Sequence, residues 1–418
     1  MEIRRESFLC IVPELFKNSI ECIPTFVFLY FVMKLNIVLS IIIVIITTML
    51  SIIITFLSWY KKIYYIEDDI LYYSKGVFSK KELKTPIKNI KAVDTKQNLK
   101  QRIFKLKTIV IDFGGTSEIA DLSITLKEKE ANKFRNILLC ITENNEAELL
   151  SEEVIYNITH KDLLIFSSTK YSIFLIISGI FSLYFIFNKL DIKVIDIAMW
   201  IYSSEYMLIF LVVFIIVARL FIIFVNYIKF YDYKVIKSNN ILDITYGLVN
   251  KKKCSLNLDN VYAVKINQSL FTKLLNRVSI GVSTIGYGDS DDEESIVFPC
   301  INKEDVDNII KTLFPRFVYS DEKYRIHPKY RFRYKNSFIG YNKEVIYLSG
   351  GIFSRKVSII SMNAVEDIEY TQNIFQKKNS IFKLEVNYKS KKYGDLNRIK
   401  GISTFHYKNI KDLLVISV

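Results

Sequence analysis

The chain reads DITYGLVNKKKCSLNLDNVYAVKINQSLFT over residues 243–272, and the same pattern occurs twice more without a gap. The other copies are YYSKGVFSKKELKTPIKNIKAVDTKQNLKQ at residues 72–101 and YLSGGIFSRKVSIISMNAVEDIEYTQNIFQ at residues 347–376. Each copy places a glycine 21 residues before a glutamine, and the pairs are Gly76 with Gln97, Gly247 with Gln268, and Gly351 with Gln372. An internal pattern of this kind indicates one folding unit that is used three times.

Beyond the glutamine, each copy continues through the same order of predicted elements. An alternating run rich in β-branched residues predicts a strand at residues 106–112, 278–284 and 381–388. A polar loop with glycine follows, and a helical pattern then closes each copy, with Leu138, Ile309 and Leu413 at the same position in it. We therefore expect each unit to contain several strands and one C-terminal amphipathic helix.

The recurring glycine and glutamine have two interpretations. A glycine can supply the positive φ of a turn, and a glutamine side chain can bond the backbone at the end of a strand. The alternative is direct contact with a ligand. We favour the structural interpretation for all six residues.

The second copy also contains STIGYGD at residues 283–289, which looks like the selectivity filter of potassium channels. A filter needs a pore helix before it and membrane-spanning helices on both sides. Here the last apolar run ends well before this stretch, and no later run is long enough to cross a bilayer. We therefore interpret GYGD as a hairpin loop, with glycines that allow positive φ.

Four apolar segments predict membrane-spanning helices, in a chain of which 50% of the residues are hydrophobic. They lie at about residues 18–34 and 37–59, and at about residues 170–188 and 207–228, so they form two hairpins. Lysine and arginine flank the outer ends of both hairpins, which places both chain ends and the middle of the chain in the cytoplasm. The expected location is the cell membrane, with several spans.

These elements give a domain plan. It consists of an N-terminal segment with a hairpin (1–59), a first unit (60–142), a linker (143–169), a second hairpin (170–228), a second unit (229–316) and a third unit (317–418). The expected fold class is therefore membrane α-helical hairpins combined with α+β units.

The repeat resembles the bacterial pleckstrin-homology-like (PH-like) family, specifically its multi-copy membrane proteins of the YdbS/YdbT type. The resemblance rests on Lys75-Gly76-Val77-Phe78 and its equivalents, and on the step from glutamine to Asn or Ser and then to Leu or Ile. ITHKDLL at residues 158–164 and RIHP at residues 325–328 are further marks of it. The resemblance implies three PH-like bent β-barrels, each of seven strands in two packed sheets and each capped by a C-terminal helix, together with four transmembrane helices.

Positive charge is concentrated in the third unit, because most of the formal net charge of +14 lies after Arg316. Basic residues beside an anionic bilayer contribute on the order of 1 kcal/mol each to binding. The candidate contacts with the membrane surface or a partner are Lys61, Lys62, Lys251, Lys252, Lys253, Lys329, Arg331, Arg333, Lys391 and Lys392. The alternative is a solvated basic face of a lysine-rich protein. Nucleic-acid binding is not expected, because no recognition motif accompanies the charge.

Nothing in the sequence points to catalysis, a metal or a cofactor. The five cysteines are widely spaced without a CxxC pair, and His160, His327 and His406 are far apart. No nucleophile with a base, no carboxylate pair and no phosphate-binding glycine loop is visible. We therefore expect a non-enzymatic protein without a cofactor.

Two classes of function remain. The first is a membrane-anchored interaction or scaffold module at the cytoplasmic face, with membrane lipids and other membrane or envelope proteins as partners, and with a homo-oligomer as a further option. The alternative is a small-solute or ion transporter or channel that uses the four helices. Few charged residues and few Gly or Pro breaks occur in the predicted spans, which favours the first class.

Overall fold

A computed structural model describes most of the chain. The described residues are 4–34, 36–90, 92–113, 121–139, 153–169, 207–284, 296–325, 337–351, 354–378, 381–389, 397–403, 406 and 408–410. The predicted span at 170–188, the GYGD loop, and the basic candidates Lys329, Arg331, Arg333, Lys391 and Lys392 lie outside these residues.

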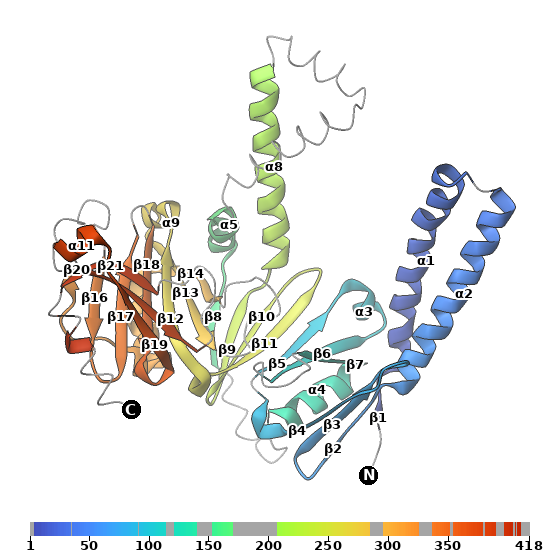
Figure 1. Ribbon diagram of the computed structural model, residues 1–418, viewed down its shortest axis with the longest axis horizontal. Helices are drawn as coiled ribbons and strands as arrows, with labels where there is room; N and C mark the ends of the chain where they lie inside the picture. The colour runs from blue at the N-terminus through green and yellow to red at the C-terminus, as the bar shows by residue number, and fades with distance from the viewer. Residues whose placement is uncertain are drawn as a thin grey trace.

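The strands form three units with one common order of elements (Figure 1). Unit 1 comprises β1 (Arg4–Arg5), β2 (Ile63–Glu67), β3 (Ile70–Lys75), β4 (Lys81–Pro86), β5 (Ala92–Gln97), β6 (Leu106–Asp112), β7 (Asp121–Lys127) and α4 (Glu128–Leu138). Unit 2 comprises β8 (Glu153–Asn157), β9 (Lys234–Ser238), β10 (Ile241–Tyr246), β11 (Lys251–Asn257), β12 (Val261–Gln268), β13 (Arg277–Thr284), β14 (Ile296–Asn302) and α10 (Val306–Leu313). Unit 3 comprises β15 (Tyr324–Arg325), β16 (Phe338–Tyr341), β17 (Val345–Gly350), β18 (Arg355–Ser361), β19 (Val365–Thr371), β20 (Ile381–Tyr388) and β21 (Arg398–Ser403).

The apolar helices are inserted between the first and second strands of units 1 and 2. In unit 1, α1 (Ile11–Val27), a π-helical turn (Phe28–Val32) and α2 (Ile37–Lys61) separate β1 from β2, yet β1 pairs with β2. In unit 2, β8 pairs with β9 although α5 (His160–Thr169) and α8 (Met207–Lys229) come between them. The predicted linker at 143–169 therefore needs correction, because it contributes β8 to the sheet of unit 2. Its five-residue strand gave no signal of its own, since its partner is so distant in sequence.

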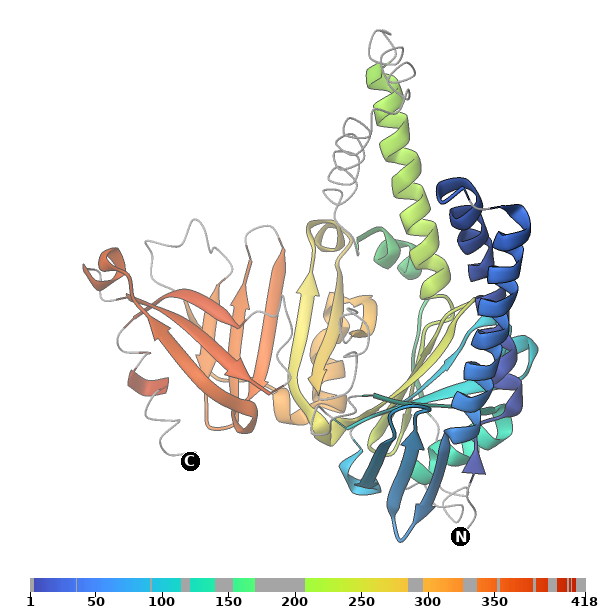
Figure 2. The same ribbon diagram turned by 45° about the vertical axis from the view of Figure 1, so that its right-hand side comes forward.

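Within the described residues, one helix, α2, is long and apolar enough to cross a membrane. Its Asn36 side chain caps it by accepting from the Val38 N–H at 3.2 Å. Both α2 and α8 project from the same side of the row of units, which is the upper side in Figures 1 and 2. We call this the helix side of the units.

The sheets cross from each unit to the next. Unit 1 and unit 2 share one antiparallel sheet in the order β7-β6-β5-β11-β10-β9-β8, and units 2 and 3 share another in the order β14-β13-β12-β18-β17-β16-β15. The ends of the row are the smaller sheets β1-β2-β3-β4 and β19-β20-β21. Each unit thus consists of two sheets, and all but the outermost two sheets continue into a neighbouring unit.

The apolar core of each unit lies between its two sheets, and in units 1 and 2 the closing helix covers it. In unit 1, Leu71 and Val93 from the two sheets and Phe134 from α4 belong to one buried cluster. In unit 2, the cluster extends across the junction and includes Val357 and Ile359 of β18. Units 2 and 3 therefore share apolar packing as well as hydrogen bonds, and burial of this kind is the main stabilising term in folding.

A short helix follows the fifth strand of every unit. These helices are α3 (Leu99–Ile103), α9 (Leu270–Leu274) and α11 (Ile374–Lys378). The residue after the recurring glutamine caps each one: Asn98 accepts from the Gln101 N–H, Ser269 from the Thr272 N–H and Asn373 from the Gln376 N–H. The sequence step from glutamine to Asn or Ser is therefore an N-cap signal.

Candidate functional site

The helix side of the units is the first candidate site. Strand direction brings two features of every unit to it: the turn that contains the recurring glycine, and the short helix. The turn between β10 and β11 lies against the end of α8, since Gly247 N–H donates to the Tyr231 carbonyl at 2.8 Å and Leu248 N–H donates to the Ile228 carbonyl at 3.1 Å. From this turn β11 runs away from the helix side, and β12 runs back toward it. In unit 1, α3 reaches the same turn through Arg102 Nη1, which lies 3.4 Å from the Leu248 carbonyl oxygen.

The helix α9 of unit 2 also lies beside α5, which contacts α8. Arg277, three residues after α9, forms an ion pair with Asp162 of α5 at 3.0 Å. α5 in turn packs against α8, and Phe166 of α5 makes an edge-to-face contact with Phe230 at 5.1 Å between ring centroids. Figures 1 and 2 show α9 and α11 at the upper ends of their strands, and α8 projects from this same upper side.

The short helices expose large apolar side chains on this side. Ile103 of α3 is 77% exposed, Leu274 of α9 is 85% exposed and Ile374 of α11 is 86% exposed. Leu270 and Phe271 of α9 are each about half exposed as well. Leu99, Leu270 and Ile374 occupy equivalent positions, as do Ile103 and Leu274. Clustered exposed apolar residues mark interaction or membrane-contact sites. We name Leu99, Ile103, Leu248, Leu270, Phe271, Leu274 and Ile374 the apolar row.

The recurring glycines hold the turns on the helix side. Gly76, Gly247 and Gly351 have φ values of +121°, +107° and +120°. A Cβ atom at Gly247 would lie 2.0 Å from the carbonyl oxygen of Asn250, and Gly76 and Gly351 meet equivalent contacts at 1.9 and 1.8 Å. Only glycine fits such a position.

The recurring glutamines support the strand ends beside the short helices. Gln97 Nε2 donates to the Leu106 carbonyl at 2.8 Å, and Gln268 Nε2 donates to the Arg277 carbonyl at 3.1 Å. Both side chains are buried, whereas Gln372 of unit 3 is exposed. This geometry accounts for the recurrence of glutamine in units 1 and 2 without a ligand.

The described basic candidates are in two places. Lys61 and Lys62 end α2, where Lys61 is exposed and Lys62 pairs with Glu6. Lys251, Lys252 and Lys253 lie on β11 at the junction of units 1 and 2, and Lys253 pairs with Asp243 at 2.8 Å. Two of the five described candidates therefore already have carboxylate partners inside the protein.

The second candidate site is a groove of about 940 Å³ at this junction. Its floor contains Arg135 of α4, which contacts both Asp243 of β10 and Ser255 of β11. Arg102, Lys107 and the three lysines of β11 also line the groove, together with Glu128, Asp232 and Asp259. Since most of these charges are paired, we interpret the groove as the seam between two units. The partners are far apart in sequence, so no motif could reveal this contact.

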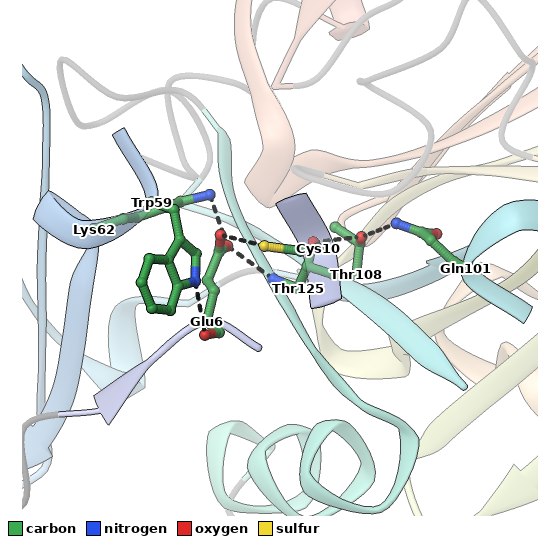
Figure 3. A network of polar contacts seen from close by, with 7 residues as sticks. All are labelled: Glu6, Cys10, Trp59, Lys62, Gln101, Thr108 and Thr125. Carbon is green, nitrogen blue, oxygen red and sulfur yellow. Dashed lines mark hydrogen bonds and ion pairs between the residues drawn. The ribbon is translucent and has the colours of Figure 1, made fainter. Parts of the chain in front are cut away.

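The third site is a polar network that attaches the N-terminal segment to unit 1 and α2 (Figure 3). The buried carboxylate of Glu6 pairs with Lys62 Nζ at 2.6 Å and accepts the Thr125 N–H at 2.8 Å. Trp59 Nε1 donates to the Glu6 carbonyl at 3.1 Å, and Phe8 packs edge-to-face on Trp59. Glu6 thus connects the base of α2 to β7, and the network fixes the direction in which α2 leaves unit 1.

Replacing Glu6 by alanine should loosen this attachment. The substitution removes two charge-assisted contacts of a buried carboxylate and leaves the Lys62 ammonium and the Thr125 N–H without them, so we expect a loss of about 2–3 kcal/mol. The measurement is hydrogen exchange of β1 and β7 in the full chain in nanodiscs. The loss of protection in Glu6→Gln should lie between that of the native chain and that of Glu6→Ala. The exposed Glu304→Ala serves as the control. Unchanged protection of β7 in Glu6→Ala would refute the role of the network.

No group of His, Cys, Asp and Glu among the described residues could hold a metal ion.

Comparison with known proteins gives two matches. The family model described as "Bacterial PH domain" matches residues 17–140 and 174–316. The UPF0699 transmembrane protein YdbT of Bacillus subtilis (strain 168) is 23% identical over 404 residues, and the alignment covers 80% of this chain and 81% of that protein. No solved structure matches.

Proposed function

Because the chain belongs to the bacterial PH domain family, as its motifs predicted, we propose that it is a membrane-anchored, non-enzymatic scaffold whose units lie along the cytoplasmic membrane surface. In this proposal the three units are PH-like barrels, and four helices anchor units 1 and 2. The scaffold binds anionic lipid headgroups and presents its outer surface to partner proteins.

The apolar row carries the proposal. Short helices with exposed apolar residues occur at the same place in all three units, and α9 and α11 lie on the side from which α2 and α8 project. Partial insertion of such side chains at the headgroup boundary buries apolar area, at about 25 cal/mol per Å². Lys61, Lys100 and Lys273 lie at or near these positions, where an anionic surface would attract them.

A rigid row also suits a scaffold better than separate tethered domains. The two shared sheets fix the orientation of each unit relative to the next. Unit 3 carries no described helix hairpin, so its contact with the bilayer depends on α11 and on its position in the row. The units would therefore approach the membrane together.

A fluorescence experiment tests contact with the bilayer. The full chain is reconstituted in liposomes with Leu274→Cys carrying an environment-sensitive fluorophore. We expect nitroxide-labelled lipids to quench this fluorophore strongly, because Leu274 inserts at the headgroup boundary.

The matched control is Lys343→Cys. This exposed residue lies in the turn between β16 and β17, at the end of β17 opposite the Gly351 turn. Its fluorophore should remain in water and show little quenching. Equal quenching at the two positions, or none at residue 274, would contradict the proposed orientation.

A further inference from the structure

We propose that copies of this chain assemble head to tail, with strand β19 of one copy paired to strand β4 of the next. The assembly would repeat, between chains, the junction that already joins the three units inside one chain. The partner is thus a second copy, and both copies remain in the same membrane.

The two internal junctions use one register. Lys251 and Arg355 each come four residues after the unit's glycine, and they lie opposite Gln97 and Gln268 of the preceding unit. The next pairs follow the same rule, since Lys252 lies opposite Lys96 and Lys356 lies opposite Asn267. The fold therefore has a defined way to place one unit beside another.

The two ends of the row present the unused halves of this junction. β4 is the unit 1 equivalent of β11 and β18, and β19 is the unit 3 equivalent of β5 and β12. Both β4 and β19 are outermost strands of their sheets within the described residues. An edge strand of this kind offers unpaired backbone groups to another chain.

Burial along these strands reflects the missing neighbour. Val93 of β5 and Val264 of β12 are fully buried, whereas the equivalent Ile368 of β19 is only half-buried. On the other half of the junction, Ser255 of β11 and Ile359 of β18 are buried, whereas the equivalent Lys84 of β4 is exposed.

Charge makes the two edges complementary. β19 carries Glu366, Asp367 and Glu369, all of them exposed, whereas β4 carries exposed Lys81 and Lys84 and one exposed carboxylate, Glu82, which pairs with Lys80. Pairing of β19 with another β19 would bring like charges together, and this disfavours such contacts. Pairing of β19 with β4 brings opposite charges together, so the charges select the head-to-tail arrangement.

An interface between two different surfaces leads to open chains or closed rings of copies. The junction between units 1 and 2 keeps α2 and α8 on one side of the row (Figures 1 and 2). A third use of the same junction would direct the hairpin of the next copy to that side again. The assembly is thus compatible with a membrane surface.

The repeated register predicts which residues meet. Thr371 occupies the position of Lys96 and Asn267, and Lys81 occupies the position of Lys252 and Lys356. Thr371 of one copy should therefore lie opposite Lys81 of the next. Opposite residues in antiparallel strands have Cα atoms about 4.5–5.5 Å apart, within the range that a disulfide spans.

Cross-linking in native membranes tests this pair. The chain with both Lys81→Cys and Thr371→Cys is oxidised and separated without reductant, and we expect a ladder of cross-linked multimers. When Lys81→Cys and Thr371→Cys are on separate chains with different tags, we expect dimers of the two tags only. The matched control is Lys81→Cys with Asp367→Cys, because Asp367 is exposed on the same strand but about 13 Å out of register.

The ladder should be at least several-fold weaker in the out-of-register control. Adding the exposed Glu369→Lys should also weaken the ladder several-fold, since it replaces a carboxylate by an ammonium on the strand edge that meets the basic edge of β4. Equal ladders in the two double variants would show random collision and overturn the proposal. A cross-linked monomer, or no cross-linked multimer in the in-register variant, would overturn it as well.

Discussion

Asp243→Ala should destabilise the junction between units 1 and 2 by about 3–5 kcal/mol, because it leaves a buried guanidinium without its carboxylate. Arg135 of α4 has a side chain that is only 7% exposed, and its ion pair with Asp243 crosses from unit 1 to unit 2. Water cannot readily replace the carboxylate there. The cost should appear as faster hydrogen exchange of β5 and β11 in the full chain in nanodiscs.

The two partners should differ in their effect. Asp243 also contacts Lys253 and Ser255, so Arg135→Met leaves the carboxylate with two partners and should cost less than Asp243→Ala. The double variant Arg135→Met, Asp243→Leu should recover part of the loss, because apolar residues can replace a buried pair at small cost.

A surface ion pair provides the control. Asp232 pairs with Lys234 at 2.9 Å, and both side chains are more than a third exposed. Asp232→Ala should therefore change stability by no more than about 1 kcal/mol. If Asp243→Ala and Asp232→Ala had equal effects, the buried pair would not hold the junction together.

Much of the secondary structure could be predicted from local patterns. The alternating runs at 106–112, 278–284 and 381–388 coincide with β6, β13 and β20 within one residue. The apolar runs at 37–59 and 207–228 coincide with α2 and α8 within two residues. Period-2 alternation and long apolar runs are the strongest signals that a single sequence contains.

The junctions could not be predicted in this way. Alternation shows which face of a strand is buried, but it does not show which strand lies beside it. Lys251, Lys252 and Lys253 therefore looked like surface charge, although β11 pairs with β5 of the preceding unit. The strands β1 and β8 were missed because each is short and an apolar helix pair separates it from its sheet partner.

The same junction contains a buried carboxyl group whose ionisation opposes folding. Asp94 of β5 is only 7% exposed, and burial raises its pKa from 3.8 to about 6. Lys96, the Cys254 thiol, the Ser255 N–H and Lys252 act in the opposite direction but do not offset the burial. A carboxyl group with a raised folded-state pKa stabilises the fold fully below its unfolded pKa, near 4. That stability is lost as the pH rises through 6.

We therefore expect Asp94→Asn to stabilise the junction at pH 8 by about 3 kcal/mol, because the amide never ionises and a shift of two pKa units is worth about that much. At pH 4 the gain should shrink to about half a kcal/mol, since the native carboxyl is then protonated in the folded state. Hydrogen exchange of β5 and β11 at the two pH values measures the difference between the variant and the native chain. A gain that is the same at both pH values would mean that ionisation of Asp94 is not its cause. Within the described residues, the position of Asp94 is occupied by Lys265 at the second junction and by the exposed Glu369 at the outer edge of β19. Of the two junctions inside the chain, only the one between units 1 and 2 therefore places a carboxyl group at this position.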